Sequence, residues 1–187
     1  MEIIQLVVIV VFLGLATILW TDERKRSRRK FTHMITAAYV LGVLYFTLLS
    51  RQPSEDSKMN LVLFYSVIRS LRYPVNTGEI IHHLLAGRFD QVFTTYKPLK
   101  AALLNIMLFV PLGYILPLYI KKRRGMFPKI IMISAMCSLC IELTQAVTRF
   151  GWFDVDDLFC NITGGAAGYL LYIIAGSLIR SWRKNNE

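Results

Sequence analysis

Charged residues are scarce in this sequence: Asp, Glu, Lys and Arg make up 18% of its 187 residues, whereas 55% are hydrophobic. A soluble domain of this length needs a more charged surface. The apolar residues here gather in runs of about 20, the length that spans a bilayer as a helix. The composition therefore excludes an ordinary soluble domain and predicts an all-α membrane protein.

Cysteine and histidine are also few, with three of each, which limits metal and redox chemistry. Cys137 and Cys140 have the CxxC spacing, but they fall in an apolar run and no second pair completes a zinc site. His82 and His83 point about 100° apart on a helix, and no third ligand accompanies them. The acidic residues at 154–157 lack the spacing of a calcium loop. We predict neither a metal nor a cofactor.

Five apolar runs predict a bundle of about five transmembrane helices in a single membrane domain, residues 1–187. Between the second and third runs lies the 51–100 loop, which contains two short amphipathic segments, 61–71 and 80–89. Both are too short and too polar to span, so we expect one or two short interfacial helices in this outer loop. The predicted spans are 3–20, 31–50, 101–120, 128–148 and 159–179.

The net charge of +10 arises chiefly from basic clusters beside the predicted spans. The 21–30 loop, the 121–127 loop and the 180–187 tail hold six, four and three Lys or Arg residues, and all three share one side of a five-helix bundle. By the positive-inside rule that side is cytoplasmic, which places the N-terminus outside and the C-terminus in the cytoplasm. The clusters favour contact with membrane lipid and not with nucleic acid.

Polar residues interrupt the predicted spans mainly near the outer surface. Glu142, Gln145 and Arg149 are spaced i, i+3, i+7, so they form one stripe along the fourth span. An ionisable residue at the centre of a membrane span costs about 2.5–3.5 kcal/mol or more, so Glu142 needs a partner or a function. By helical rise it lies about 10 Å below the outer boundary.

A second stripe opens the fifth span, where Asp154, Asp157 and Asn161 repeat the same spacing. Acidic residues at a helix start suit its dipole and can cap free N–H groups. Asn105 lies near the outer start of the third span. Because unpaired polar groups in lipid are costly, we expect the two stripes to face one another with Asn105 nearby.

Small residues and prolines mark other contacts within the bundle. Gly164 and Gly168 form a small-xxx-small pair, which permits a close helix contact within the chain or with a second copy. Pro111 frees the carbonyl of Met107, and Pro117 repeats the effect nearer the cytoplasm. Neighbouring helices or a cavity must then satisfy the freed groups.

Two interpretations of the polar residues stay open. In the first they form a structural network, in which Arg149 pairs with Asp154 or Asp157 and Glu142 is protonated. In the second they form a site open to the outer leaflet or to extracellular water. The density of polar groups at one depth favours the site, since helix packing rarely needs two carboxamides, a buried acid and a basic residue together.

Several motifs in order resemble the VanZ-like family over about residues 40–175. One departure exists: members commonly carry Asn-Leu-x-Pro-Phe after the second span, and this chain has Asn60-Leu-Val-Leu-Phe64, without the proline of the turn. The family is named for a membrane protein linked to teicoplanin resistance in Gram-positive bacteria, which implies a role in the cell envelope. The matching segments are Asn105–Gly113, Glu142–Gln145, Arg149, Phe153–Leu158, Asn161–Gly164 and Gly168, with Arg51 at a further family position.

The resemblance and the polar residues together imply an outward-facing pocket that binds or modifies an amphiphilic or lipid-linked envelope ligand. The expected partners are membrane lipid and a lipoglycopeptide or lipid-linked cell-wall precursor. The alternatives are a membrane-embedded hydrolase or transferase acting on an envelope lipid or glycan, with Glu142, Asp154 or Asp157 as catalytic candidates, and a small transporter or flippase component. The candidate ligand-binding residues are Asn105, Glu142, Gln145, Arg149, Asp154, Asp157 and Asn161.

Overall fold

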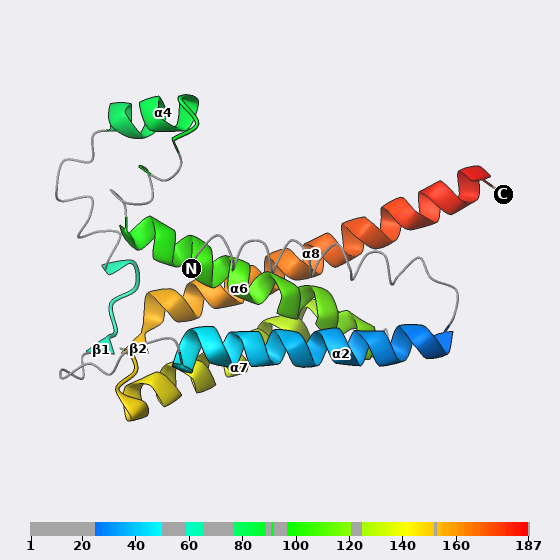
Figure 1. Cartoon of the computed structure of the whole chain (residues 1–187), viewed down its shortest axis with the longest axis horizontal. Coiled ribbons are helices and arrows are strands. Elements are labelled where there is room, and N and C mark those ends of the chain that lie inside the picture. The colour runs from blue at the N-terminus through cyan, green and yellow to red at the C-terminus, as the bar shows by residue number, and fades with distance from the viewer. Residues whose placement is uncertain are drawn as a thin grey trace.

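The computed structural model describes residues 25–49, 59–65, 77–88, 91, 97–120, 125–151 and 153–186. Within these residues the chain is an all-α membrane protein, apart from one pair of two-residue strands (Figure 1). Its elements are α2 (Lys25–Leu44), the π-helix η1 (Tyr45–Leu49), β1 (Met59–Asn60), α4 (Thr77–Leu85), α6 (Lys97–Tyr119), α7 (Met126–Thr148), β2 (Phe153–Asp154) and α8 (Val155–Asn186).

Four of the described helices are long and apolar enough to cross a membrane: Lys30–Leu48, Lys100–Tyr119, Met126–Thr148 and Val155–Asn186. They coincide with four of the five predicted spans, and the span predicted at 3–20 lies outside the described residues. The last helix is longer than predicted. Its 32 residues reach about 48 Å at 1.5 Å per residue, beyond a hydrocarbon core of about 30 Å. The tail from 180 to 186 is therefore a continuation of α8.

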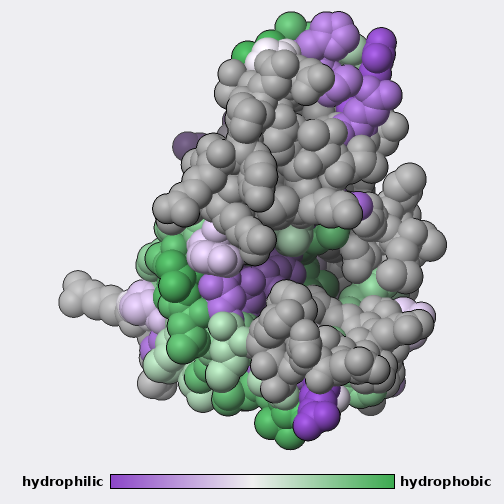
Figure 2. Space-filling view, turned by 90° about the vertical axis from the view of Figure 1, so that its left-hand side faces the viewer, coloured by the Kyte–Doolittle hydropathy of each residue, from purple (hydrophilic) through white to green (hydrophobic). Residues whose placement is uncertain are grey.

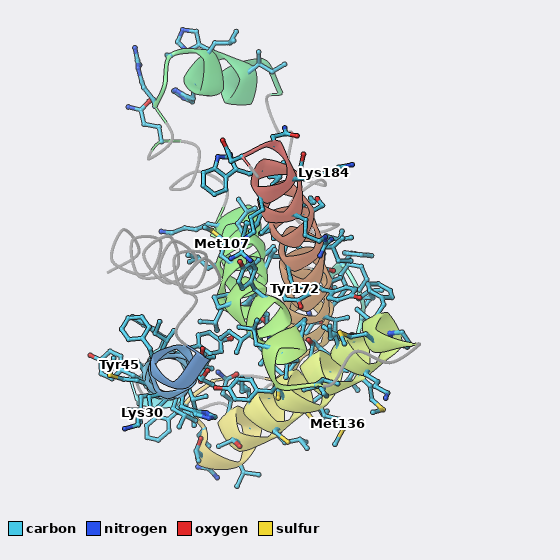
Figure 3. The ribbon with its side chains drawn as sticks, turned by 90° about the vertical axis from the view of Figure 1, so that its right-hand side faces the viewer. Lys30, Tyr45, Met107, Met136, Tyr172 and Lys184 are labelled. Atoms are coloured by element: carbon cyan, nitrogen blue, oxygen red, sulfur yellow. The ribbon has the colours of Figure 1, made fainter. Side chains whose placement is uncertain are left out.

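The lateral surface of the bundle is apolar, as a lipid-facing surface must be. Large hydrophobic side chains are exposed along all four long helices. Tyr45 and Met136 are two of them, and both point away from the neighbouring helices (Figure 3). In the same view α6 lies between α2 and α8.

Helices α6 and α8 approach so closely that their glycines meet backbone. A Cβ atom placed on Gly164 would lie 2.1 Å from the carbonyl oxygen of Ile106, and one on Gly168 would lie 2.0 Å from that of Val110. Gly113 of α6 meets the carbonyl of Gly165 in the same way. The predicted close contact of the glycine pair is confirmed, and its partner is α6 of the same chain.

Helix α2 is attached to α6 by side-chain hydrogen bonds along its length. The Tyr39 hydroxyl donates to the carbonyl of Leu108 at 2.8 Å, and the hydroxyls of Thr36 and Tyr119 lie 2.9 Å apart. Helix α6 continues through Pro111 and Pro117 without ending. The carbonyl that accepts from Tyr39 of α2 belongs to Leu108. The carbonyl that Pro111 was predicted to free belongs to the preceding residue, Met107.

Strands β1 and β2 pair in parallel, with Met59 opposite Phe153 and Asn60 opposite Asp154. This pairing ties the loop that follows the second span to the start of α8, and the all-α prediction did not include it. We call this end of the bundle the β-bridge end. The predicted interfacial helix at 80–89 corresponds to α4, which Figure 1 shows at the top, set apart from the four long helices. In the other predicted segment, 61–71, the described residues form a turn.

Replacing Gly168 with Ala should destabilise the bundle by about 1–3 kcal/mol, the usual cost of an added methyl in a packed contact. Gly42→Ala on α2 is the matched control, because nothing lies within 4 Å of its added Cβ. The control should be neutral or slightly stabilising, since Ala favours a helix over Gly. The thermal unfolding midpoint of the purified protein measures both variants, and equal midpoints would contradict the close contact.

Candidate functional site

One face of α7 changes from apolar to polar toward the β-bridge end. Its buried residues follow at intervals of three or four, from Met126 and Ile130 to Ser134, Ser138, Glu142 and Gln145. This spacing stacks them along one side of the helix. Glu142 is 2% exposed and Gln145 is 1% exposed, so the predicted stripe faces the interior of the bundle. Arg149 does not share this burial.

Glu142 joins α7 to the start of α8. Its Oε2 atom accepts a hydrogen bond from the backbone N–H of Asp154 at 3.0 Å. The Asp154 carboxylate in turn accepts from the backbone N–H of Asp156 at 2.8 Å and from Nδ2 of Asn60 at 3.0 Å. The bond from the Asp156 N–H to the Asp154 carboxylate caps α8, as predicted from the acidic residues at the start of this helix. The buried acid, the cap and β1 therefore form one connected group.

Asp154 lies just outside the membrane-spanning segment and is partly buried. Burial raises the pKa of its carboxyl above the ordinary value, and the nearby Asp156 carboxylate acts in the same direction. The hydrogen bonds from the Asp156 amide and from Asn60 act in the opposite direction but do not cancel the effect of burial. Asp154 therefore takes up a proton at a higher pH than a solvent-exposed aspartate does.

The segment after Asn60 forms a tight turn although the family's proline is missing. The Asn60 side chain accepts from the backbone N–H of Val62 at 3.3 Å, and Phe64 has a left-handed backbone with φ 59°. The backbone N–H of Phe64 donates to the carboxylate of Asp156, and its ring meets that of Phe159 with centroids 5.3 Å apart. Side-chain hydrogen bonds thus hold the turn in place of the proline.

Gln145 joins α7 to the end of the second span. Its Nε2 atom donates to the carbonyl of Thr47 at 2.8 Å, within the π-helix η1. Because a carbonyl oxygen can only accept, the amide orientation of Gln145 is determined: nitrogen faces Thr47 and oxygen faces away. The Oε1 atom is buried and has no hydrogen-bond partner among the described residues.

Asn161 joins α8 to α7 one turn further from the β-bridge end. Its Nδ2 atom donates to the hydroxyl oxygen of Ser138 at 2.8 Å. The residue is 3% exposed, and its Oδ1 atom also has no hydrogen-bond partner in the described part of the chain.

The structure brings together four of the predicted ligand-binding residues: Glu142 contacts Asp154, Gln145 lies on the same buried face, and Asn161 bonds to Ser138 one turn away. Asp157 is partly buried in the first turn of α8. Asn105 is partly buried on α6 and precedes Ile106, whose carbonyl faces Gly164 of α8. Arg149 is exposed and ends α7 with a left-handed backbone.

Several residues of this region were not among the predicted site residues. Asn60 was identified only as part of a family motif, and Asp156 lies off the predicted stripe of Asp154, Asp157 and Asn161. Ser134 and Ser138 continue the Glu142 stripe inward at helical spacing. This spacing in the sequence could have identified them as buried neighbours of Glu142. Thr47 could not have been found, because it contributes a backbone carbonyl from 98 residues earlier in the chain.

Seen from the β-bridge end, the surface has hydrophilic residues bordered by hydrophobic ones (Figure 2). Asn60, Asp154, Asp156 and Asp157 are partly exposed at this end, and Leu61 and Val62 beside them are exposed. Within the described residues, no group of three or more His, Cys, Asp or Glu side chains is placed to hold a metal ion. The arrangement is therefore suited to hydrogen bonding and to contact with apolar groups.

The fold and these residues define a multi-pass helical membrane protein whose buried polar side chains gather toward one end of the bundle. The family model described as VanZ/LLP1 matches residues 3–176, and the chain belongs to this family. The match confirms the resemblance inferred from the motifs. No curated protein and no solved structure matches the chain.

Asn60→Ala should release β1 from the start of α8, because a hydrogen bond to a charged group contributes about 1.5–3 kcal/mol. We expect faster hydrogen–deuterium exchange at the amides of Val62 and Phe64, with no change along α7. Met59→Ala is the control, since Met59 lies on the same strand with its side chain 64% exposed. Equal exchange in the two variants would show that the Asn60 side chain does not hold the turn.

Proposed function

We propose that this protein acts in the cell envelope, with its β-bridge end facing outside, and binds or modifies an amphiphilic or lipid-linked ligand there. The proposed biological outcome is resistance to teicoplanin or a related lipoglycopeptide. Family membership supports an action linked to resistance. The orientation is supported by the basic ends of the helices: the start of α2 and the end of α8 lie opposite β1 and β2 (Figure 1).

The observation that carries the proposal is the buried Oε1 atom of Gln145, for which the described residues provide no hydrogen-bond donor. A purely structural network would pair all of its members, because a buried polar atom without a partner costs about 1–3 kcal/mol. Gln145 cannot relieve this cost by turning its amide, since Thr47 requires the nitrogen. We infer that a donor other than the described residues, such as a hydroxyl or amine of a ligand headgroup, supplies this bond.

The β-bridge end of the bundle suits an amphiphile. It carries the carboxylates of Asp154 and Asp156, and the exposed Arg149 ends α7 there. A continuous apolar run is also exposed after Asn60, and it comprises Leu61, Val62, Leu63, Phe64 and Tyr65. Polar headgroup contacts beside apolar contacts for an acyl chain are what a lipid-bearing ligand requires.

The test replaces Glu142, Arg149 and Asp157 singly with Ala and measures teicoplanin susceptibility in a host where the parent chain confers resistance. We expect each change to lower the minimum inhibitory concentration by about tenfold or more, since losing a charged contact costs about 1.5–3 kcal/mol. Protein levels are matched by immunoblotting of membranes.

Two control variants separate the site from general damage. Lys129→Ala removes an exposed basic residue from the opposite end of α7, and Thr144→Ala changes an exposed position between Glu142 and Gln145. Both should keep parental resistance. If all three site variants kept parental resistance at matched protein level, the proposed function would be wrong.

A further inference from the structure

Further from the β-bridge end than Gln145, two buried polar atoms on facing helices have no hydrogen-bond partner among the described residues. They are the hydroxyl oxygen of Ser134 on α7 and Oδ1 of Asn161 on α8. Ser134 is 0% exposed and Asn161 is 3% exposed, so neither atom reaches the bulk solvent or the lipid. Neither finds a hydrogen-bond partner in the described part of the chain.

The behaviour of Ser134 differs from that of other hydroxyls in these helices. A Ser or Thr in a helix ordinarily donates to a carbonyl one turn earlier. Ser134 makes no such bond; its oxygen instead faces α8, where a Cβ atom on Gly165 would lie only 2.1 Å from it. Six hydroxyls in the same protein follow the ordinary pattern: Thr36, Thr47, Thr144, Thr148, Thr163 and Ser177.

The Asn161 side chain meets α7 one helical turn from Ser134. Asn161 bonds to Ser138, and Ser138 follows Ser134 by four residues, a spacing that separates Cβ atoms by about 5–6 Å. One water molecule with two hydrogen bonds of about 2.8 Å spans that distance. On the facing helix α8, Asn161 and Gly165 are also four residues apart. Asn161 lies opposite Ser138, and Gly165 lies opposite Ser134.

We propose that a water molecule binds between Ser134 and Asn161 and that it is the innermost member of a hydrated column that continues past Ser138 to Glu142. The column ends at Ile130, one turn further inward, which is 0% exposed and apolar. It therefore opens only toward the β-bridge end. This inference concerns water alone and does not depend on the ligand of the proposed function.

The test measures how fast a thiol at position 134 exchanges its proton for deuterium. Ser134→Cys is introduced into the full chain with Cys137, Cys140 and Cys160 changed to Ala, and the infrared S–H stretch is followed after transfer to heavy water. Ile130→Cys is the matched control, equally buried and one turn inward on the same face. An apolar cavity left there stays dry.

We expect the thiol at 134 to exchange at least about tenfold faster than the thiol at 130, because polar buried sites hold exchangeable water and apolar ones do not. Arg149→Cys, exposed at the end of α7, gives the upper reference, and the lipid-facing Met136→Cys gives the lower one. Exchange at 134 as slow as at 130 and 136 overturns the column.

Should the chain without native cysteines fail to fold, the same measurement uses Ser134→Cys in the otherwise unchanged protein. The spectrum of the parent, whose thiols at 137 and 140 are exposed and whose thiol at 160 is buried, is then subtracted. A fast-exchanging additional band supports the column, and a slow one contradicts it. Neither result depends on teicoplanin susceptibility, so this inference and the proposed function can fail separately.

Discussion

The hydrogen bond from the Asp154 amide to the Glu142 carboxylate is the interaction around which the β-bridge end is organised. It joins the last turns of α7 to the residue before α8. Asp154 then uses its own carboxylate to cap α8 and to hold Asn60. A buried acid thus finds its partner in a free backbone N–H at a helix start, where the positive end of the helix dipole suits a negative side chain.

Close backbone contact between α6 and α8 makes this arrangement possible. Gly113, Gly164 and Gly168 leave no room for side chains between the helices, and in lipid such contacts replace the hydrophobic effect as the source of association. Gly165 lies on a different face of α8, directed at α7, and lets Ser134 approach the backbone of α8. The small residues of one helix therefore decide where the polar residues of its neighbours can meet.

Depth along the membrane followed from the sequence, because helical rise and the order of the spans place Glu142, Gln145 and Asn161 in one layer. Partners did not follow. Gln145 bonds to the backbone carbonyl of Thr47, and Asn161 bonds to Ser138, one turn from Glu142 on the same face of α7. Asp156, off the predicted stripe, accepts from the Phe64 amide because a strand pairing brings the loop to it.

The sequence by itself determined the class of protein, four of the spans within the described residues, the capping of α8 and the close contact of its glycines. These depend on local length, hydropathy and spacing along one helix. Only the tertiary structure decided that α6 is the partner of those glycines, that β1 pairs with β2, and that Glu142 meets the Asp154 amide. Such contacts join segments far apart in the chain through backbone atoms, and backbone atoms are the same at every position of a sequence.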